Sequence, residues 1–221
     1  MLDLLLKGGI LMWPILALSI ISLSIILEKF YSFHTVKLNI PQFLSKLEDE
    51  LKQNELEDVL KKYERSKSPL IEACVIALRS WSLSWEEKEE IFSQFSTTQI
   101  RKLGKRVRAL GIIGHILPLL GLLGTVIGMI KAFMTVENLE GSVNPGILAG
   151  GIWEALLTTA AALAVAIPTL AIYHYFEGKL DDFYLQMRDI AFHTDKLLKR
   201  WKNERNFPEK DFSIFRNSSS C

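Results

Sequence analysis

Three long stretches of this sequence lack charged residues almost completely. Gly8–Leu27 carries none, 109–130 carries none apart from His115, and 141–173 carries only Glu154. Each stretch reaches the roughly 20 residues that an α-helix needs to cross about 30 Å of hydrocarbon. A core helix of a soluble protein seldom contains so long an uncharged run, which argues against a single soluble globule. The sequence therefore predicts an all-α, multi-pass membrane protein with three transmembrane helices.

Positive charge is scarce on one side of these predicted spans. Of the 26 Lys and Arg residues, 15 lie from Lys29 to Arg108 and nine follow Glu177, which leaves only Lys7 and Lys131 elsewhere. Lys and Arg accumulate at the cytoplasmic ends of membrane helices. We therefore predict that the N-terminus lies outside, that the C-terminus is cytoplasmic, and that only a short loop between the second and third spans lies outside.

Catalytic and metal-binding motifs are missing as well. The sequence contains no GxSxG, HExxH, Walker A or CxxC motif, and its four histidines do not have metal-ligand spacing. We therefore expect neither enzyme activity nor a cofactor. The basic segment 101–108 adjoins a span and has no interleaved aromatic residues, which favours anionic membrane lipids over nucleic acid. Cys74 and Cys221 fall on the predicted cytoplasmic side, so no disulfide is expected.

The order of these patterns predicts the organisation of the chain. Apolar residues at helical spacing lead from Glu86 into the second span and continue from the third span to Asn203, so both spans should extend into long cytoplasmic helices. No small-x-small cleavage site precedes Glu28, so we expect Met1–Leu27 to remain in the mature protein. The predicted segments are a transmembrane helix at 1–30, a cytoplasmic helical region at 31–108, a second span at 109–135, an outer loop at 136–146, a third span at 147–176, a helical extension at 177–207 and a disordered tail at 208–221.

Small residues distinguish the second and third spans from the first. The first span is mostly Leu and Ile, whereas the other two are rich in Gly, Ala and Thr. Membrane helices that pack closely on other helices need small residues. We therefore predict that the second and third spans face protein and that the first faces lipid. The residues concerned are Gly121, Gly124 and Gly128, the last two forming a GxxxG pair, and Ala155, Thr159, Ala162 and Ala166.

Four of the polar side chains within the predicted spans leave alternatives open. Glu154 is directed either at a partner or wet cavity, or at the headgroups or a neighbouring helix that it pins. Thr125 and Thr159 could each bond the backbone carbonyl four residues earlier, which would make them structural. His115 fits an interfacial or helix-pairing role better than that of a proton relay.

Two prolines also lie inside the predicted spans. Pro118 and Pro168 each free a backbone carbonyl within the membrane, and that carbonyl needs water or a neighbouring donor. A simple kink is the alternative explanation. Since both proline-containing helices also carry the threonines, the combination favours a hydrated interior over a dry bundle.

Two stretches of the sequence carry a recognisable pattern. The first is LPLLGLLGTVIGM, from Leu117 to Met129. The second comprises Gly146-Ile147 and EALLTTA at 154–160 and continues up to Pro168, and together they resemble the MotA/TolQ/ExbB proton-channel family. The similarity is greatest to ExbB and TolQ and covers nearly the whole chain. The resemblance implies a bacterial inner-membrane protein with a periplasmic N-terminus. It also implies a homopentamer around two single-span helices of an ExbD or TolR partner that carry an aspartate, with proton flow driving rotation that is passed to TonB or TolA.

Site residues follow from the same resemblance by position. Thr125 and Thr159 match the family's pore-lining threonines, and Glu154 matches its glutamate near the outer end of the third span. Ala162 stands where the family often has glycine and Thr158 where alanine is common, so either could alter the width of the pore. Two alternatives remain, a non-conducting membrane scaffold that assembles and anchors a partner complex and, more weakly, a self-sufficient ion channel.

Overall fold

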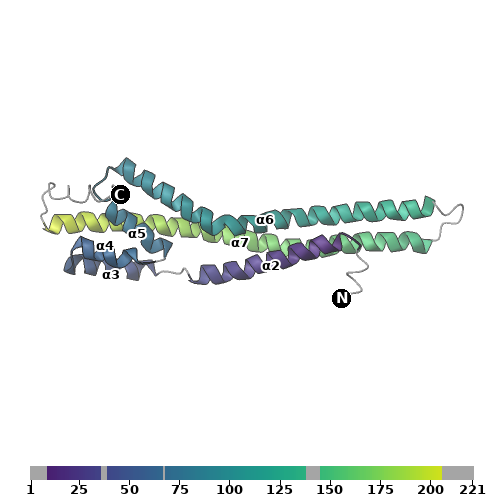
Figure 1. The fold of residues 1–221 in the computed structure, drawn as a ribbon, viewed down its shortest axis with the longest axis horizontal. Helices are drawn as coiled ribbons and strands as arrows, with labels where there is room; N and C mark the ends of the chain where they lie inside the picture. Colours follow the sequence, from purple (N-terminus) through teal and green to yellow (C-terminus); the bar gives the residue numbers. More distant parts are fainter. Residues whose placement is uncertain (1–8, 36–38, 67, 138–144, 206–221) are drawn as a thin grey trace. The chain divides into compact units, whose positions relative to one another are not determined.

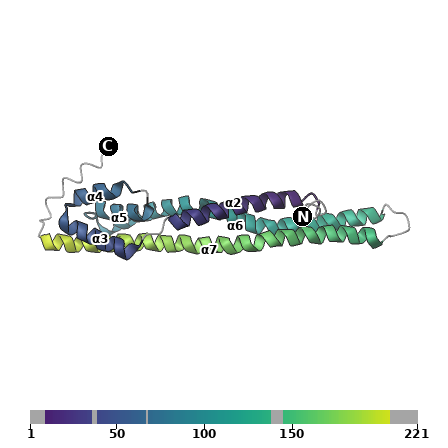
Figure 2. The same cartoon turned by 90° about the horizontal axis from the view of Figure 1, so that it is seen from below.

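The computed structural model describes residues 9–35, 39–66, 68–137 and 145–205, and throughout these residues it contains helices and no strand (Figures 1 and 2). The predicted all-α class is confirmed. The helices are α2 (Met12–Thr35), α3 (Ile40–Gln53), α4 (Leu56–Glu64), α5 (Pro69–Arg79), α6 (Trp85–Glu137) and α7 (Pro145–Arg205).

Three of the described helices, α2, α6 and α7, are long and apolar enough to cross a membrane. The prediction of three spans is confirmed, and so is the extension of the second and third into long helices. Most of the expected loop, at 138–144, and the expected tail at 208–221 lie outside the described residues.

Local signals in the sequence set where α6 begins. The Ser84 hydroxyl accepts from the backbone N–H of Glu87 at 3.3 Å, and the Glu87 carboxylate accepts from the backbone N–H of Ser84 at 2.9 Å. This reciprocal capping box satisfies two donors at the start of the helix. From there α6 continues through Pro118, and α7 continues through Pro168, so neither proline ends its helix.

The described chain divides into two compact units, and α6 and α7 each contribute to both. The first unit contains residues up to His34 together with 104–178. Its core joins Ile15 of α2 to Ile113 and Leu117 of α6 and to Ala162 and Ala166 of α7. Towards the end of α2, the ring of Phe30 packs edge-on against the fully buried Phe176 at a centroid distance of 5.2 Å.

The second unit contains residues 35–103 and the chain from Lys179 onward. Helices α3, α4 and α5 pack against the end of α7 (Figure 1). Long-range bonds connect these elements: the indole N–H of Trp201 donates to the carbonyl of Leu51 at 2.5 Å, and the hydroxyl of Thr194 donates to the thiol sulfur of Cys74 at 3.5 Å. The fully buried apolar residues of this core include Leu47, Leu51, Leu70, Leu78, Met187, Ile190 and Leu198.

Candidate functional site

Small residues bring α6 and α7 into direct backbone contact within the first unit. A side chain added at Gly121 would place its Cβ 2.8 Å from the Cβ of Ala162 and 3.1 Å from the Cα of Thr159. Such distances leave no room for a methyl group, so the glycines set the separation of the two helices. The pairs along this contact are Gly111 with Tyr173, Gly114 with Leu170, Gly121 with Ala162, Gly124 with Thr158, Gly128 with Ala155, and Ala132 with Gly151.

The predicted narrow face of α7 lies in this contact. Ala155 is 2% exposed, and Ala162 and Ala166 are completely buried. Thr158 is 2% exposed as well, with its methyl group against Gly124. In this single chain these residues therefore pack α7 against α6, and they do not face an open space.

Thr159 crosses the same contact with a hydrogen bond. Its hydroxyl lies 2.8 Å from the carbonyl oxygen of Gly121 on α6 and 3.4 Å from that of Ala155 on its own helix. The shorter bond therefore joins the two helices. The longer bond, to Ala155, is the one that the structural alternative predicts. This hydroxyl holds α7 to α6 at the level of Gly121.

Thr125 lies one helical turn after Gly121 on α6. In an α-helix the N–H of residue 125 donates to the carbonyl of residue 121, so the backbone of Thr125 and the hydroxyl of Thr159 share one acceptor. The hydroxyl of Thr125 itself donates to the carbonyl of Leu122 at 2.7 Å. The structure thus brings the two predicted threonines together around the carbonyl of Gly121.

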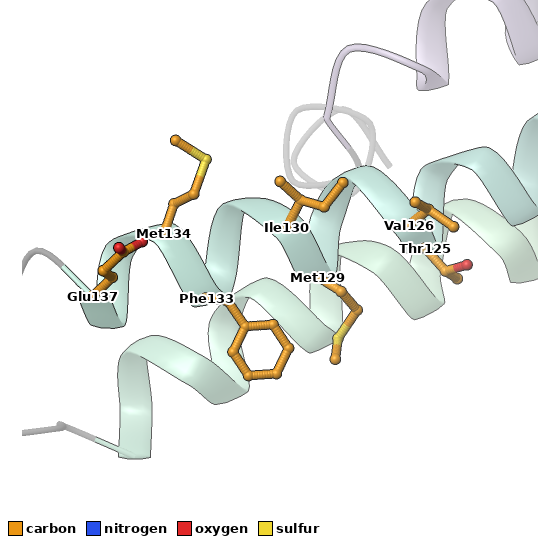
Figure 3. A pocket seen from close by; sticks show the side chains of 7 residues that line it. All are labelled: Thr125, Val126, Met129, Ile130, Phe133, Met134 and Glu137. Carbon is orange, nitrogen blue, oxygen red and sulfur yellow. The ribbon is translucent and has the colours of Figure 1, made fainter.

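An open groove of about 520 Å³ begins at Thr125 and follows α6 toward its end (Figure 3). Thr125 and Glu137 lie at its two ends, and the side chains of Met129 and Phe133 lie between them. Apart from these two end residues the lining is apolar. The groove therefore offers an apolar surface with a hydroxyl at one end. Its complete lining is Thr125, Val126, Met129, Ile130, Phe133, Met134 and Glu137.

Glu154 lies elsewhere, against the start of α2. A Cβ added at Gly9 would overlap the carboxylate of Glu154, and Gly9 has a positive φ of 73° that glycine adopts without strain. Thr159 follows Glu154 by five positions, which places their side chains about 140° apart around α7. Glu154 therefore does not share the face of α7 on which Thr159 reaches Gly121.

The two predicted prolines differ in their surroundings. Pro118 is half-buried and Pro168 is exposed, and both lie inside uninterrupted helices. His115, three residues before Pro118, places its Nδ1 2.7 Å from the carbonyl of Gly111. One ring nitrogen of His115 is therefore occupied by its own backbone.

Two features of the site were not predicted from the sequence. The apolar groove could have been inferred from Met129 and Phe133, which follow Thr125 at helical spacing. The carboxylate of Glu28 pairs with Arg106 between α2 and α6, and Lys29 next to it is only 5% exposed. No local signal could have shown that contact, because its members lie far apart in the sequence.

Within the described residues, no group of three His, Cys, Asp or Glu side chains has the arrangement needed to hold a metal ion. The site consists of hydroxyls, backbone carbonyls and apolar surface. Such groups can exchange hydrogen bonds with a carboxyl group or with water.

Comparison with known proteins extends these observations. The model of the MotA/TolQ/ExbB proton channel family matches residues 46–189. Biopolymer transport protein exbB1 of Vibrio cholerae is 27% identical over 166 residues, which cover 74% of this chain and 73% of that protein. An ExbB-like protein of Synechocystis is 31% identical over 180 residues, covering 78% of this chain and 69% of its own length.

An ExbB homologue of Methanothermobacter thermautotrophicus is 27% identical over 177 residues. That alignment covers 80% of this chain but only 62% of the relative's length. The family match covers more than half of the chain, including α6 and most of α7. The protein is thus a multi-pass membrane protein, and it belongs to the MotA/TolQ/ExbB proton channel family.

Proposed function

We propose that this chain is a subunit of an inner-membrane proton-channel motor that couples the proton-motive force to mechanical work on a TonB- or TolA-type partner. One observation carries the proposal: Thr125 and Thr159 meet around the carbonyl of Gly121, at the end of an open apolar groove. Relatives named as biopolymer transport proteins of the ExbB type support it.

The chemistry of the hydroxyl group suits this role. A threonine hydroxyl donates to a carboxylate and accepts from a carboxylic acid, so it stabilises a proton carrier in both protonation states. Each proton that crosses the membrane releases about 2.3 kcal/mol per 100 mV. Because this energy is modest, each step of a motor must proceed with small barriers.

The proton-carrying aspartate of the proposed motor comes from a second protein. The sequence has no aspartate between Asp58 and Asp181, so the second and third spans contain none. The groove beside Thr125 is apolar and open, which fits the side of a single transmembrane helix. We propose that a single-span partner of the ExbD or TolR type places its aspartate near Thr125, and that five copies of this chain surround the partner helices.

Replacement of the two hydroxyls tests the proposal. Valine has the shape of threonine without the hydroxyl, so Thr125→Val and Thr159→Val remove the polar groups with little change in volume. We expect the double variant, assembled with its partner in vesicles, to lose proton flux by about 100-fold, within the range of proton-transfer groups. Thr135→Val is the matched control, because Thr135 bonds its own helix at the carbonyl of Lys131.

Assembly must be measured beside the flux, by co-purification with the partner and by the mass of the complex. An assembled double variant that conducts protons like the wild type would exclude the threonines from the pathway. An assembled wild-type complex that conducts no protons would favour the non-conducting scaffold. Flux through the purified chain alone would favour the self-sufficient channel.

A further inference from the structure

A cluster of titratable side chains lies on α7, at the end of the part of α7 that belongs to the first unit. The hydroxyl of Tyr173 donates to one carboxylate oxygen of Glu177, and Nδ1 of His174 lies 3.0 Å from the other. Within this unit these three residues bring an acid, an imidazole and a phenol together. Neither the threonine pair nor the groove includes any of them.

The position of this cluster along α7 relates it to the candidate site. Glu177 follows Thr159 by 18 residues, which is five complete turns of an α-helix, so both side chains leave α7 on the same side. The two residues are separated by about 27 Å along the helix axis. Glu177 thus lies on the same side of α7 as Thr159, at the end of the third span that is followed by Lys179.

Contacts with α6 place this alignment beside the same helix pair. The ring of Tyr173 packs on Gly111, where an added Cβ would lie 2.8 Å from Cε2 of the tyrosine. The carbonyl of Gly111 in turn holds Nδ1 of His115 at 2.7 Å. A second imidazole therefore lies on α6 between the level of the threonines and the Tyr173 cluster.

The chain itself leaves the outer side of the cluster uncovered. The side chain of His174 is 67% exposed and that of Glu177 is 46% exposed. The aromatic rings of α2 cover neighbouring positions of α7 instead, with Phe30 against Tyr175 and Phe176. Both groups are therefore accessible for proton exchange from outside the chain.

A charged group of the neighbouring helix α6 acts on the cluster. Arg108 lies close enough for its charge to act on Tyr173. The hydrogen bond from Tyr173 keeps the pKa of Glu177 below its ordinary value, and the bond from His174 acts in the same direction. The carboxylate of Glu177 is therefore ionised at neutral pH, and its negative charge lies beside the ring of His174.

We infer that Tyr173, His174 and Glu177 form the proton-transfer site at the inner mouth of the pathway that contains Thr125 and Thr159. This inference rests on the proposed function. A proton that leaves the pathway as hydronium is taken up by the imidazole of His174 or by the carboxylate of Glu177. The same group then passes a proton to bulk water, so that one proton enters and one leaves without any change in oxidation state.

Imidazole and carboxylate side chains suit this task because free protons are scarce at neutral pH. An imidazole and a carboxylate each bind a proton reversibly and can pass it on through hydrogen bonds. Tyr173 acts as a positioning residue, since its hydroxyl orients the carboxylate of Glu177 and its ring is packed against Gly111.

Proton flux in weakly buffered vesicles tests the inference, with this chain assembled with its single-span partner. In the double variant His174→Gln and Glu177→Gln we expect the initial flux at neutral pH to fall by at least about tenfold. Imidazole added on the side of the cluster should restore the flux, because a mobile buffer replaces the missing side chains. Glu177→Asp should retain most of it.

The matched control replaces an exposed histidine and an exposed glutamate elsewhere, as His193→Gln with Glu90→Gln. A double variant that assembles and conducts like the wild type would overturn the inference and leave the proposed function intact. A loss of flux that imidazole does not restore would also overturn it, because it would show a structural role. If the wild-type complex itself conducts no protons, the proposed function fails and the inference fails with it.

Discussion

Gly121 combines two roles at the scale of a single residue. Its missing side chain lets α7 approach α6, and its carbonyl accepts the hydroxyl of Thr159. Both roles depend on the same close contact. A methyl group at this position would therefore disturb the threonine pair as well as the packing of the helices.

Gly121→Ala should destabilise the protein even though alanine is the better helix former. Alanine gains about 1 kcal/mol in helix propensity. The new methyl group would lie 2.8 Å from Ala162 and 3.1 Å from the backbone of Thr159, and overpacking costs about 1–3 kcal/mol. Thermal unfolding in detergent should show a lower midpoint.

Gly150→Ala is the matched control for this substitution. Gly150 also lies in a described helix, but an added Cβ there would have no atom within 4 Å. We expect an unchanged or slightly higher midpoint. A lower midpoint for both variants would mean that the contact at Gly121 does not cause the loss.

Cys74 is a buried thiol whose reactivity depends on folding. Burial raises its pKa from 9 to about 12, against the small opposing effect of the bond from Thr194. Alkylation requires the thiolate, so Cys74 should react slowly in the native protein between pH 9 and 11, where the unfolded thiol is already ionised. The rate of iodoacetamide modification against pH measures this difference.

Both rates are measured in a Cys221→Ala background, and a cysteine at an exposed position, such as Ser82→Cys with Cys74→Ala, provides the reference rate. We expect iodoacetamide to modify this reference cysteine of the native protein at the ordinary rate of an exposed thiol. Equal rates at the two positions would contradict burial of Cys74.

At the scale of the helices, the start of α6 is held to α7 by one ion pair. Lys88 lies 2.6 Å from Asp195, and Lys199 of α7 lies 2.8 Å from the same carboxylate. The side chains of Lys88 and Asp195 are 17% and 14% exposed, so this pair is screened less than a surface pair. Together with the capping box of Ser84, it positions the first turns of α6.

Asp195→Asn should therefore destabilise the second unit. Burial alone would raise the pKa of Asp195, but the bonds from Lys199 and Lys88 outweigh it and leave the pKa below its ordinary value of 3.8. A lowered pKa means that the ionised carboxylate of Asp195 stabilises the fold through Lys88 and Lys199. This stabilisation is present above pH 4 and is lost as the pH falls below that value. At pH 7 we expect a loss of roughly 1–3 kcal/mol in the free energy of unfolding, measured by thermal or chemical unfolding.

Asp189→Asn is the control, because Asp189 is exposed on the same helix. It should leave the free energy of unfolding unchanged at both pH values. If Asp195→Asn lowered stability equally at pH 7 and below pH 4, the loss would not come from the charge of Asp195.

The helices themselves could be predicted from local patterns. Uncharged runs predicted the three spans, and apolar residues at helical spacing predicted that the second and third spans continue as long helices. Spacing also predicted the small-residue face of α7. Each of these signals depends on residues within a few turns of one another, which is the range over which sequence acts directly on backbone conformation.

The assignment of partners could not be predicted in the same way. Thr159 bonds Gly121, Glu154 lies against Gly9, and Thr194 bonds Cys74. In each case the partners belong to different helices. Which faces of two helices meet depends on the packing of all their side chains, and a single helix pattern does not encode it.

At the scale of the whole molecule, the distribution of charge determines the expected orientation in the membrane. Basic residues are concentrated in 29–108 and after Glu177, and the only others are Lys7 and Lys131, the latter near the outer end of the predicted second span. The cost of moving many cations across the bilayer favours the orientation that leaves these basic segments in the cytoplasm. The end of α6 at Glu137 should then lie outside, and its beginning at Glu90 should lie inside.

Labelling of single cysteines in intact cells tests this orientation. In a background of Cys74→Ala and Cys221→Ala, Glu137→Cys should react with a membrane-impermeant maleimide added to whole cells. Glu90→Cys should react only after the membrane is permeabilised, because both positions are exposed and differ only in the side that they face. Labelling of Glu90→Cys in intact cells, with Glu137→Cys protected, would show that the protein has the opposite orientation. The inner mouth assigned to Glu177 and His174 would then lie outside, and protons would enter where we expect them to leave.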